Sequence, residues 1–372
     1  MKRKKFLTIA GSSLMVAGVG YYLLSDKSNF SRGDDTHEEP LKLPLKPDER
    51  TILQLASLAP SGHNTQPWLI KYLEPFHWIV GNDKTRWLPA VDPNQRETIL
   101  SIGAFLQNLE YAAGNLGYHC KMTLLAATNQ GADIVDVVLT KTGSLIVFDT
   151  QKIEHRRTVR SNYLDDTLKK EDLDYFVGEE EGFIHYLPNT SKEHQWLNEE
   201  TIEANRLQCY RDAAQNELAD WIRFSSKEAA QHADGLTLAS MEIEGIPAWY
   251  LRNFYSKKDV IKSSFRDQSI DKVAKQVSHS AGWLVITSKD GSVATLLETG
   301  RRLQRLWLKI RGKNIAIHPM TQILEEATTS QLLNGFVGIS EPIQFILRTG
   351  YLKDYPAPVS LRRSIEQFIV PS

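Results

Sequence analysis

A short loop near residue 60 carries polar side chains that suit a flat ligand with a polar edge. It reads Pro60-Ser61-Gly62-His63-Asn64-Thr65-Gln66-Pro67-Trp68, between a predicted helix and a predicted strand. Ser61, Asn64 and Gln66 offer neutral hydrogen-bond donors and acceptors, and Pro60 and Gly62 favour a tight turn. Such groups can meet the edge of a planar aromatic ring. Taken alone, the segment is equally typical of a capped turn between two core elements.

A second candidate binding segment is cationic. It reads His155-Arg156-Arg157-Thr158-Val159-Arg160. Arg156 and Arg160 are four residues apart and would share one face of a helix, and Thr158 adds a hydroxyl donor. Cationic donors of this kind suit a phosphate, and Arg362 and Arg363 near the C-terminal end could add charge. The alternative is a basic cluster on the surface.

These segments resemble two signatures of the nitroreductase-like FMN oxidoreductases. The loop matches the family's Pro-Ser-x-x-Asn-x-Gln-Pro-Trp signature, and residues 156–160 are similar to its Arg-x-Ser-x-Arg/Lys segment, with threonine in place of serine. The resemblance implies an α+β nitroreductase-like fold and FMN as cofactor. It places the loop against the isoalloxazine ring and the basic segment on the FMN phosphate. The cofactor-binding residues expected on this basis are Pro60, Ser61, Gly62, Asn64, Gln66, Arg156, Thr158, Arg160, Arg362 and Arg363.

A third stretch, Asn314–Pro319, occupies the place of the family's Gly-Leu-Gly-x-x-Pro loop. In the family a backbone N–H of that loop approaches flavin N5. Here Asn314 and Ala316 replace the two glycines, so the resemblance assigns the amide to Ile315 or Ala316. No catalytic residue follows from the resemblance. His63 is a candidate proton donor near the ring, and a solvated loop histidine is the alternative.

The chain also contains an internal repeat. Four residues recur at a single offset of 197 positions: Gly103, Leu106, Gln107 and Leu109 match Gly300, Leu303, Gln304 and Leu306. A period of this length indicates a duplicated domain and not a solenoid. In the resembling family each flavin site draws on two subunits, and here the two signatures fall in different halves. This arrangement, with Asp234-Gly235 in the middle, is similar to the Acg-type branch and implies a fused pseudo-dimer that could be monomeric.

The N-terminal segment 1–25 has the pattern of an export signal or a membrane anchor. Met1–Lys5 is basic, and Phe6–Leu24 contains no charged residue. A helix of nineteen residues would span roughly 28 Å, close to one bilayer core. The length of the run and the lack of an Ala-x-Ala site favour a retained anchor over a cleaved signal. We therefore expect an N-terminal apolar helix and an extracytoplasmic, periplasmic globular part, in preference to a cytoplasmic one.

Composition excludes several classes of protein. The 44 basic and 45 acidic residues give a net charge of −1, which argues against a nucleic-acid partner. Two cysteines, Cys120 and Cys209, exclude a disulfide framework. The histidines form no metal-ligand spacing, so no metal site is expected, and Walker, Gly-x-Ser-x-Gly and His-Glu-x-x-His motifs are absent.

The predicted organisation is a signal or anchor at 1–25, a polar linker at 26–47, a first half at 48–155 and a second half at 156–372. The second half contains a helical insertion at about 168–271. We expect an FMN-dependent oxidoreductase of the nitroreductase type, with a small-molecule, quinone or protein electron donor. The sequence leaves open the donor, the acceptor and whether one or two flavins bind.

Two alternatives to this function remain. The first is a non-catalytic protein that sequesters FMN beneath a lid at 234–255. The second is a tethered structural protein without flavin. The oxidoreductase and the FMN store both require Asn64 and Arg160 to contact the same mononucleotide.

Overall fold

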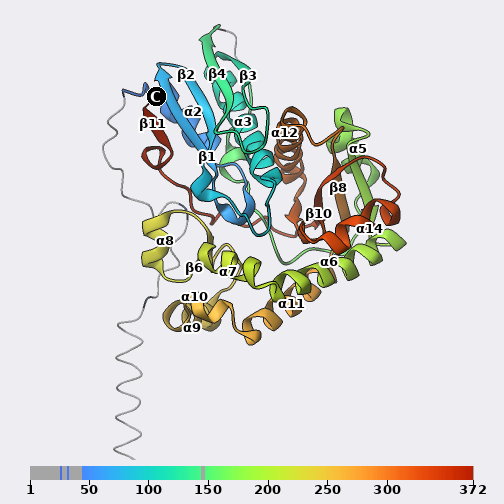
Figure 1. The fold of residues 1–372 in the computed structure, drawn as a ribbon. Coiled ribbons are helices and arrows are strands. Elements are labelled where there is room, and N and C mark those ends of the chain that lie inside the picture. Colours follow the sequence, from blue (N-terminus) through green and yellow to red (C-terminus); the bar gives the residue numbers. More distant parts are fainter. Residues whose placement is uncertain (1–25, 27–31, 33–43, 144–146, 372) are drawn as a thin grey trace, which may run out of the picture.

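The computed structural model describes residues 26, 32, 44–143 and 147–371 (Figure 1). The expected N-terminal apolar helix lies outside these residues. No helix among the described residues is both long enough and apolar enough to span a membrane. The described chain is a mixed α+β structure, as expected.

The first sheet is built mainly from the first half of the chain. Its strands are β1 (Trp68–Glu74), β2 (His77–Asn82), β3 (Tyr118–Leu124), β4 (Asp133–Lys141) and β11 (Ile369–Pro371). They lie in the order β11-β1-β2-β4-β3. Strand β11 is parallel to β1, whereas the other neighbours are antiparallel. The C-terminal end therefore returns to the first sheet, which the predicted division into consecutive halves does not include.

The second sheet has the same plan. It consists of β5 (Ile184–Pro188), β8 (Gly282–Thr287), β9 (Ile315–Pro319) and β10 (Ile343–Tyr351), in the order β5-β8-β10-β9. All of its neighbouring strands are antiparallel. Apart from β11, each sheet has two strands before a long helix and two after it, and the fourth of these strands lies between the second and the third. Strand β5 belongs to this sheet although it falls within the predicted insertion.

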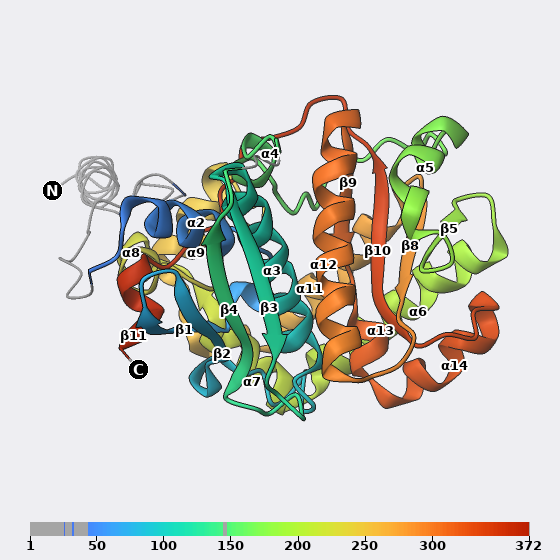
Figure 2. The same ribbon diagram turned by 90° about the horizontal axis from the view of Figure 1, so that it is seen from above.

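The two long helices are α3 (Arg96–Asn115) and α12 (Val293–Ile310), and they lie next to each other between the sheets (Figure 2). A Cβ on Gly103 would overlap the carbonyl oxygen of Leu297, and a Cβ on Gly300 would overlap that of Leu100. Leu100 and Leu297 are themselves separated by the 197-residue offset of the repeat. The recurring glycines therefore mark the place where the two helix backbones meet.

Polar groups extend this helix contact. Gln304 Nε2 donates to Asn108 Oδ1 at 2.7 Å, and Arg305 Nη1 donates to Gln107 Oε1 at 3.0 Å. One hydrophobic cluster contains core residues of both helices and both sheets, including Leu100, Leu303 and Ile317. The two halves therefore share one core.

The remaining elements cover the sheets, and most helices from the middle of the chain, residues 192–277, lie below the sheets in Figure 1. In the first half they are α2 (Pro47–Ser57), η1 (Gly62–Asn64), η2 (Lys84–Arg86) and α4 (Gln151–Glu154). In the middle of the chain they are α5 (Lys170–Val177), η3 (Gly178–Glu180), α6 (Lys192–Tyr210), α7 (Asp212–Trp221), β6 (Ile222–Arg223), α8 (Ser226–His232), β7 (Leu236–Thr237), α9 (Gly245–Phe254), α10 (Lys257–Val260) and α11 (Ser263–Val277). Near the C-terminal end they are η4 (Arg311–Lys313), α13 (Gln322–Glu325), α14 (Ala327–Val337) and η5 (Ile365–Gln367).

The helix contact leads to a stability prediction. Gly103→Ala should lower the free energy of unfolding by about 1–3 kcal/mol, because the new methyl group forces the helix backbones apart. Chemical denaturation of the purified chain measures this change. Gly335→Ala on α14 is the matched control, since its methyl group would meet open space, and it should be neutral or slightly stabilising. Equal effects of the two substitutions would contradict the role given to Gly103.

Candidate functional site

The loop after α2 is held in a strained conformation. His63, Asn64 and Gln66 have positive φ values of 47°, 55° and 54°, which non-glycine residues rarely adopt. Ser61 Oγ accepts a hydrogen bond from the Gln66 amide at 2.9 Å. Strain of this kind is typical of binding and active sites and persists only where surrounding contacts enforce it.

The enforcing contacts come from distant parts of the chain. Asn64 Nδ2 donates to the carbonyl oxygens of Gly235 and Leu361, both at 3.2 Å. Gln66 Nε2 donates to the Ala233 carbonyl at 2.9 Å. The side chains expected to meet a ring edge therefore bind protein groups, and they hold the loop against the insertion and the C-terminal segment.

The Asp234-Gly235 pair has a physical role in this arrangement. Asp234 is buried and forms ion pairs with Arg86 at 2.8 Å and Arg223 at 2.7 Å. Gly235 has a φ of 72°, and a Cβ there would overlap the Trp221 carbonyl. Both residues therefore fix the position of the insertion beside the loop.

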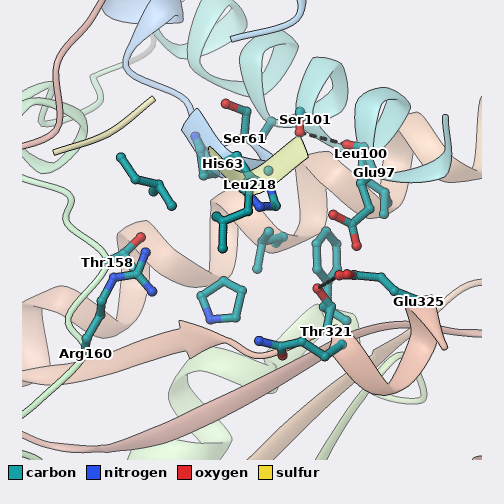
Figure 3. A pocket seen from close by; sticks show the side chains of 18 of the residues that line it. Ser61, His63, Glu97, Leu100, Ser101, Thr158, Arg160, Leu218, Thr321 and Glu325 are labelled. Carbon is teal, nitrogen blue, oxygen red and sulfur yellow. Dashed lines mark hydrogen bonds between the residues drawn. The ribbon is translucent and has the colours of Figure 1, made fainter. Parts of the chain in front are cut away.

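A cavity of about 290 Å³ lies beside the loop. Its walls come from the loop, α3, α12, the basic segment, the insertion and the chain after β9 (Figure 3). The lining residues used below are Pro60, Ser61, Gly62, His63, Glu97, Leu100, Ala104, Thr158, Arg160, Gln208, Leu218, Leu236, Leu303, Trp307, Pro319, Thr321 and Glu325. The sequence analysis identified the loop and the basic segment, and the structure brings both to this cavity.

Arg160 and Thr158 occupy one side of the cavity (Figure 3). Arg160 Nε donates to the Ser240 carbonyl at 3.0 Å, and its Nη1 contacts His318 Nε2 at 2.6 Å. Burial, followed by the charge of Arg160, holds the pKa of His318 well below its usual range. His318 is therefore neutral and accepts a hydrogen bond from Arg160. The Arg160 guanidinium is thus held in place by protein groups.

His63 also faces the cavity. Burial and then the charge of Arg160 lower the pKa of its imidazole to about 4. The ring is therefore neutral near pH 7, and the imidazolium that a proton donor requires is scarce. This environment differs from that of a solvated loop histidine and does not favour the acid role considered for it.

Carboxyl groups lie on the opposite side from Arg160 (Figure 3). Glu325 is hydrogen-bonded to Gln208 Nε2 at 2.5 Å and to Thr321 Oγ1 at 3.0 Å. Glu97 forms an ion pair with Arg96 at 2.8 Å. Burial, reinforced by the charge of Glu97, raises the pKa of Glu325 to about 8. The Glu325 carboxyl is therefore protonated at neutral pH and can donate a hydrogen bond or a proton.

A buried arginine cluster lies behind the Pro60 and Trp307 walls. Arg156 stacks over the Trp307 ring at 4.6 Å, and its Nη2 donates to the Leu58 carbonyl at 3.1 Å. Arg362 Nη2 donates to the same carbonyl at 3.2 Å and to that of Ala59 at 3.0 Å. Arg32, from the predicted linker, is a third member, because its charge acts on both Arg156 and Arg362.

Several N–H groups of this cluster are buried without a partner. Within the described part of the chain, Arg156 Nε and Nη1, Arg362 Nε and Arg32 Nη2 make no hydrogen bond. Burial, followed by the charge of Arg32, lowers the pKa of Arg156 to about 9, and burial lowers that of Arg362 as well. Uncompensated buried charge is costly, so the cluster has the chemistry of an anion site.

Seven of the twelve expected cofactor-binding residues do not line the cavity: Asn64, Gln66, Arg156 and Arg362, described above, and Ile315, Ala316 and Arg363. Ile315 and Ala316 are fully buried in β9, where they pair with Tyr351 and Gly350 of β10. Within the stretch Asn314–Pro319, the residue that lines the cavity is Pro319. Arg363 donates to the carbonyls of Gln66 and Trp68, at 2.5 and 2.9 Å, and thereby fixes the loop.

Sequence reasoning missed Arg32, Trp307 and Glu325 as site residues. Arg32 lies in a segment whose composition is that of a tether, and Glu325 belongs to no motif. The only signal for Trp307 was its place on the repeated helix, one turn after Leu303. No group of three or more His, Cys, Asp or Glu side chains suited to a metal ion occurs among the described residues.

The raised pKa of Glu325 predicts a pH-dependent effect on stability. Between about pH 4.5 and pH 8 the unfolded chain loses this proton while the folded chain keeps it, so Glu325 lowers stability progressively as pH rises. Glu325→Gln should therefore raise the free energy of unfolding near pH 8 by on the order of a few kcal/mol and have little effect near pH 4. Denaturation at both pH values tests this, with the exposed Glu199→Gln as control. A pH-independent effect of Glu325→Gln would contradict the assignment.

Comparison with known proteins gives similarity over most of the chain. "Probable NAD(P)H nitroreductase PigM" of Serratia sp. is 23% identical over 346 residues, covering 88% of this chain and 93% of that protein. "Putative NAD(P)H nitroreductase acg" of Mycobacterium tuberculosis is 24% identical over 328 residues, covering 86% and 94%. No family model matches the chain.

Among solved structures, the FMN-dependent nitroreductase NfnB from Mycobacterium smegmatis in complex with NADPH aligns with a TM-score of 0.34 and 14% identity. The alignment covers 55% of this chain and 87% of NfnB. A structural likeness of this size carries no argument. The sequence relatives, in contrast, extend over nearly their whole lengths and include an Acg protein. They confirm the resemblance that the loop and the basic segment indicated: the chain is similar over most of its length to proteins named as NAD(P)H nitroreductases, an Acg protein among them.

Proposed function

We propose that the chain is an FMN-binding oxidoreductase of the nitroreductase type, which passes electrons through a tightly bound flavin to a second substrate. Its relatives are named as NAD(P)H nitroreductases. The observation that carries the proposal is the arginine cluster behind the Pro60 and Trp307 walls of a cavity that both halves of the chain line.

The arginine cluster fits an FMN phosphate. Arg156 is buried and Arg362 is partly buried, both donate to the Leu58 carbonyl, and both retain buried N–H groups without partners among the described residues. An FMN phosphate carries close to two negative charges. It would accept hydrogen bonds from these donors and offset the charge of both guanidiniums. Thr158, two residues after Arg156, lines the adjacent cavity and adds a hydroxyl.

The cavity offers walls for the flavin ring. Leu100 and Ala104 of α3 face it from one half, and Leu303 and Trp307 of α12 from the other. Its volume of about 290 Å³ lies near the lower end of the range for small-molecule sites, roughly 300–1,000 Å³. When bound, the flavin would take up two electrons and deliver them to the acceptor. The chain's own part is to hold the ring, to limit water, and to present the protonated Glu325 carboxyl beside it.

The pseudo-dimer forms part of this proposal. The shared strand order of the two sheets, the 197-residue offset and the reciprocal glycine contacts support two related halves fused in one chain. The described residues contain one arginine cluster of this composition, which supports one flavin per chain.

Attachment to a membrane through residues 6–24, with the globular part outside the cytoplasm, also belongs to the proposal. It rests on the basic start and the uncharged run that follows. The names of the relatives make NAD(P)H the first electron donor to test. An extracytoplasmic location would make a quinol the second.

A store for FMN is the second candidate function, and the insertion favours it. Leu218 and Leu236 of the insertion form part of the cavity wall. Glu242 accepts hydrogen bonds from the Arg160 amide at 2.9 Å and from Arg157 Nη2 at 3.2 Å. The insertion is therefore fastened over the basic segment, where it would limit access to a bound ring.

The phosphate assignment predicts a loss of flavin affinity in Arg156→Ala. A charged hydrogen bond contributes about 1.5–3 kcal/mol, so FMN should bind about tenfold to a hundredfold more weakly. Titration of the flavin-free protein with FMN, followed by flavin fluorescence, gives both dissociation constants. Arg206→Ala, at an exposed arginine paired with Glu203, is the control and should bind as the parent does. Unchanged affinity in a folded Arg156→Ala protein would reject the phosphate site.

Stopped-flow reduction separates the oxidoreductase from the store. An oxidoreductase should lose the visible absorbance of its bound flavin on mixing with NADPH, NADH or a quinol, with a rate that saturates with donor. Bound flavin that stays oxidised with every donor would favour the store. Leu236→Ala supplies a further comparison, since removal of a wall residue should speed reduction where the insertion limits access.

A further inference from the structure

The outer face of α9 is apolar and exposed. Ile246 is 81% exposed and Tyr250 is 50% exposed, and their four-residue spacing places them on one face of the helix. Ala248 and Arg252, on other faces, are buried. Ile261, just after α10, is exposed as well. Single exposed apolar residues are ordinary, whereas a cluster marks a binding surface.

Aromatic rings and lysines border this face. The Tyr250 ring lies 5.1 Å from that of Phe254 and 5.9 Å from that of Tyr255. Lys257 and Lys258 follow on α10, and Lys262 comes directly before α11. Aromatic residues with adjacent lysines are typical of protein that lies at the boundary between lipid headgroups and water.

Asp26 is fastened beside the same helix. Its carboxylate accepts hydrogen bonds from the Ser226 amide and hydroxyl, both at 2.8 Å. Its amide donates to Asn253 Oδ1 at 3.0 Å, and its carbonyl accepts from Asn253 Nδ2 at 3.2 Å. Asn253 belongs to α9, one turn after Tyr250. Residue 26 is therefore held at the end of the exposed apolar face.

The sequence before Asp26 indicates which kind of surface the exposed face of α9 contacts. Phe6–Leu24 is uncharged and ends two residues before the fastened aspartate. A membrane segment that ends at Leu24 brings Asp26 to the headgroup region. Tyr250 lies about 5 Å and Ile246 about 10 Å along the α9 axis from Asn253, at 1.5 Å per residue. Both side chains therefore lie close to the point at which the proposed membrane segment ends.

We propose that the exposed face of α9, centred on Ile246 and Tyr250, lies on the lipid surface of the membrane to which residues 6–24 attach the chain. The inference rests on the proposed attachment and not on flavin chemistry. It gives the globular part a fixed orientation, with the insertion toward the bilayer and the β3–β4 edge of the first sheet away from it.

The test uses the full chain in vesicles of phosphatidylcholine and phosphatidylglycerol. Ile246→Cys, in a background of Cys120→Ser and Cys209→Ala, is labelled with an environment-sensitive fluorophore. The matched control is Leu332→Cys on α14, which is also an exposed apolar helix position. Brominated lipid should quench the label at 246 at least threefold more than the label at 332.

Flotation of the labelled protein with vesicles, measured in parallel, reports attachment itself. Flotation together with equal quenching at 246 and 332 would overturn the α9 contact while leaving the attachment intact. A label at 246 that is shielded from a soluble quencher but not reached by brominated lipid would overturn it too, since another protein surface would then cover α9. A chain that fails to float would overturn both proposals and leave the flavin titration unaffected.

Discussion

The contact between α3 and α12 is the constraint on which the candidate site depends. The helices approach closely because Gly103 and Gly300 lack side chains, and each glycine faces a leucine carbonyl of the other helix. Leu100, whose carbonyl takes part in that contact, also lines the cavity, and Leu303 lies one turn after Gly300. The spacing of the helices therefore sets the width of the cavity. A site lined by both halves of the chain requires this fixed spacing, because neither helix alone supplies both walls.

Arg156 and Arg160 have equivalent places in the sequence motif, but their buried guanidiniums differ in their hydrogen-bond partners. Arg160 is satisfied by Ser240 and His318, whereas Arg156 keeps two buried nitrogens without partners in the described chain. Removing a guanidinium from water without such compensation costs free energy. That cost is consistent with a ligand that supplies the missing acceptors. The outer two basic residues of the motif thus differ: Arg156 retains donors that the proposed phosphate would use, whereas Arg160 lines the cavity and, after burial, contributes to the lowered pKa of His318.

The sequence predicted the features that depend on a local motif or on a regular repeat of residue types. The glycine contact was visible as a repeat, because close helix packing restricts residue type at fixed positions. The direction of a loop side chain leaves no such trace: Asn64 and Gln66 are turned toward Gly235 and Ala233, about 170 residues away in the chain. Glu325 gains its raised pKa from burial beside Glu97, a property of the assembled cavity. The return of β11 to the first sheet was equally invisible, because Ile369–Pro371 is too short for a strand pattern.

Two of the contacts between the insertion and the site have different consequences. Residues 233–236 fasten the strained loop through Asn64, Gln66 and the Asp234 ion pairs, and Leu236 of the same segment lines the cavity. Movement there would release the loop that the site requires. The second attachment joins Glu242 to Arg157, Arg160 and Ser161, and the Ser240 carbonyl to Arg160 Nε. Glu242 itself has a strained φ of 57°. This attachment contacts the basic segment and not the strained loop, so its release would leave the contacts of Asn64 and Gln66 in place.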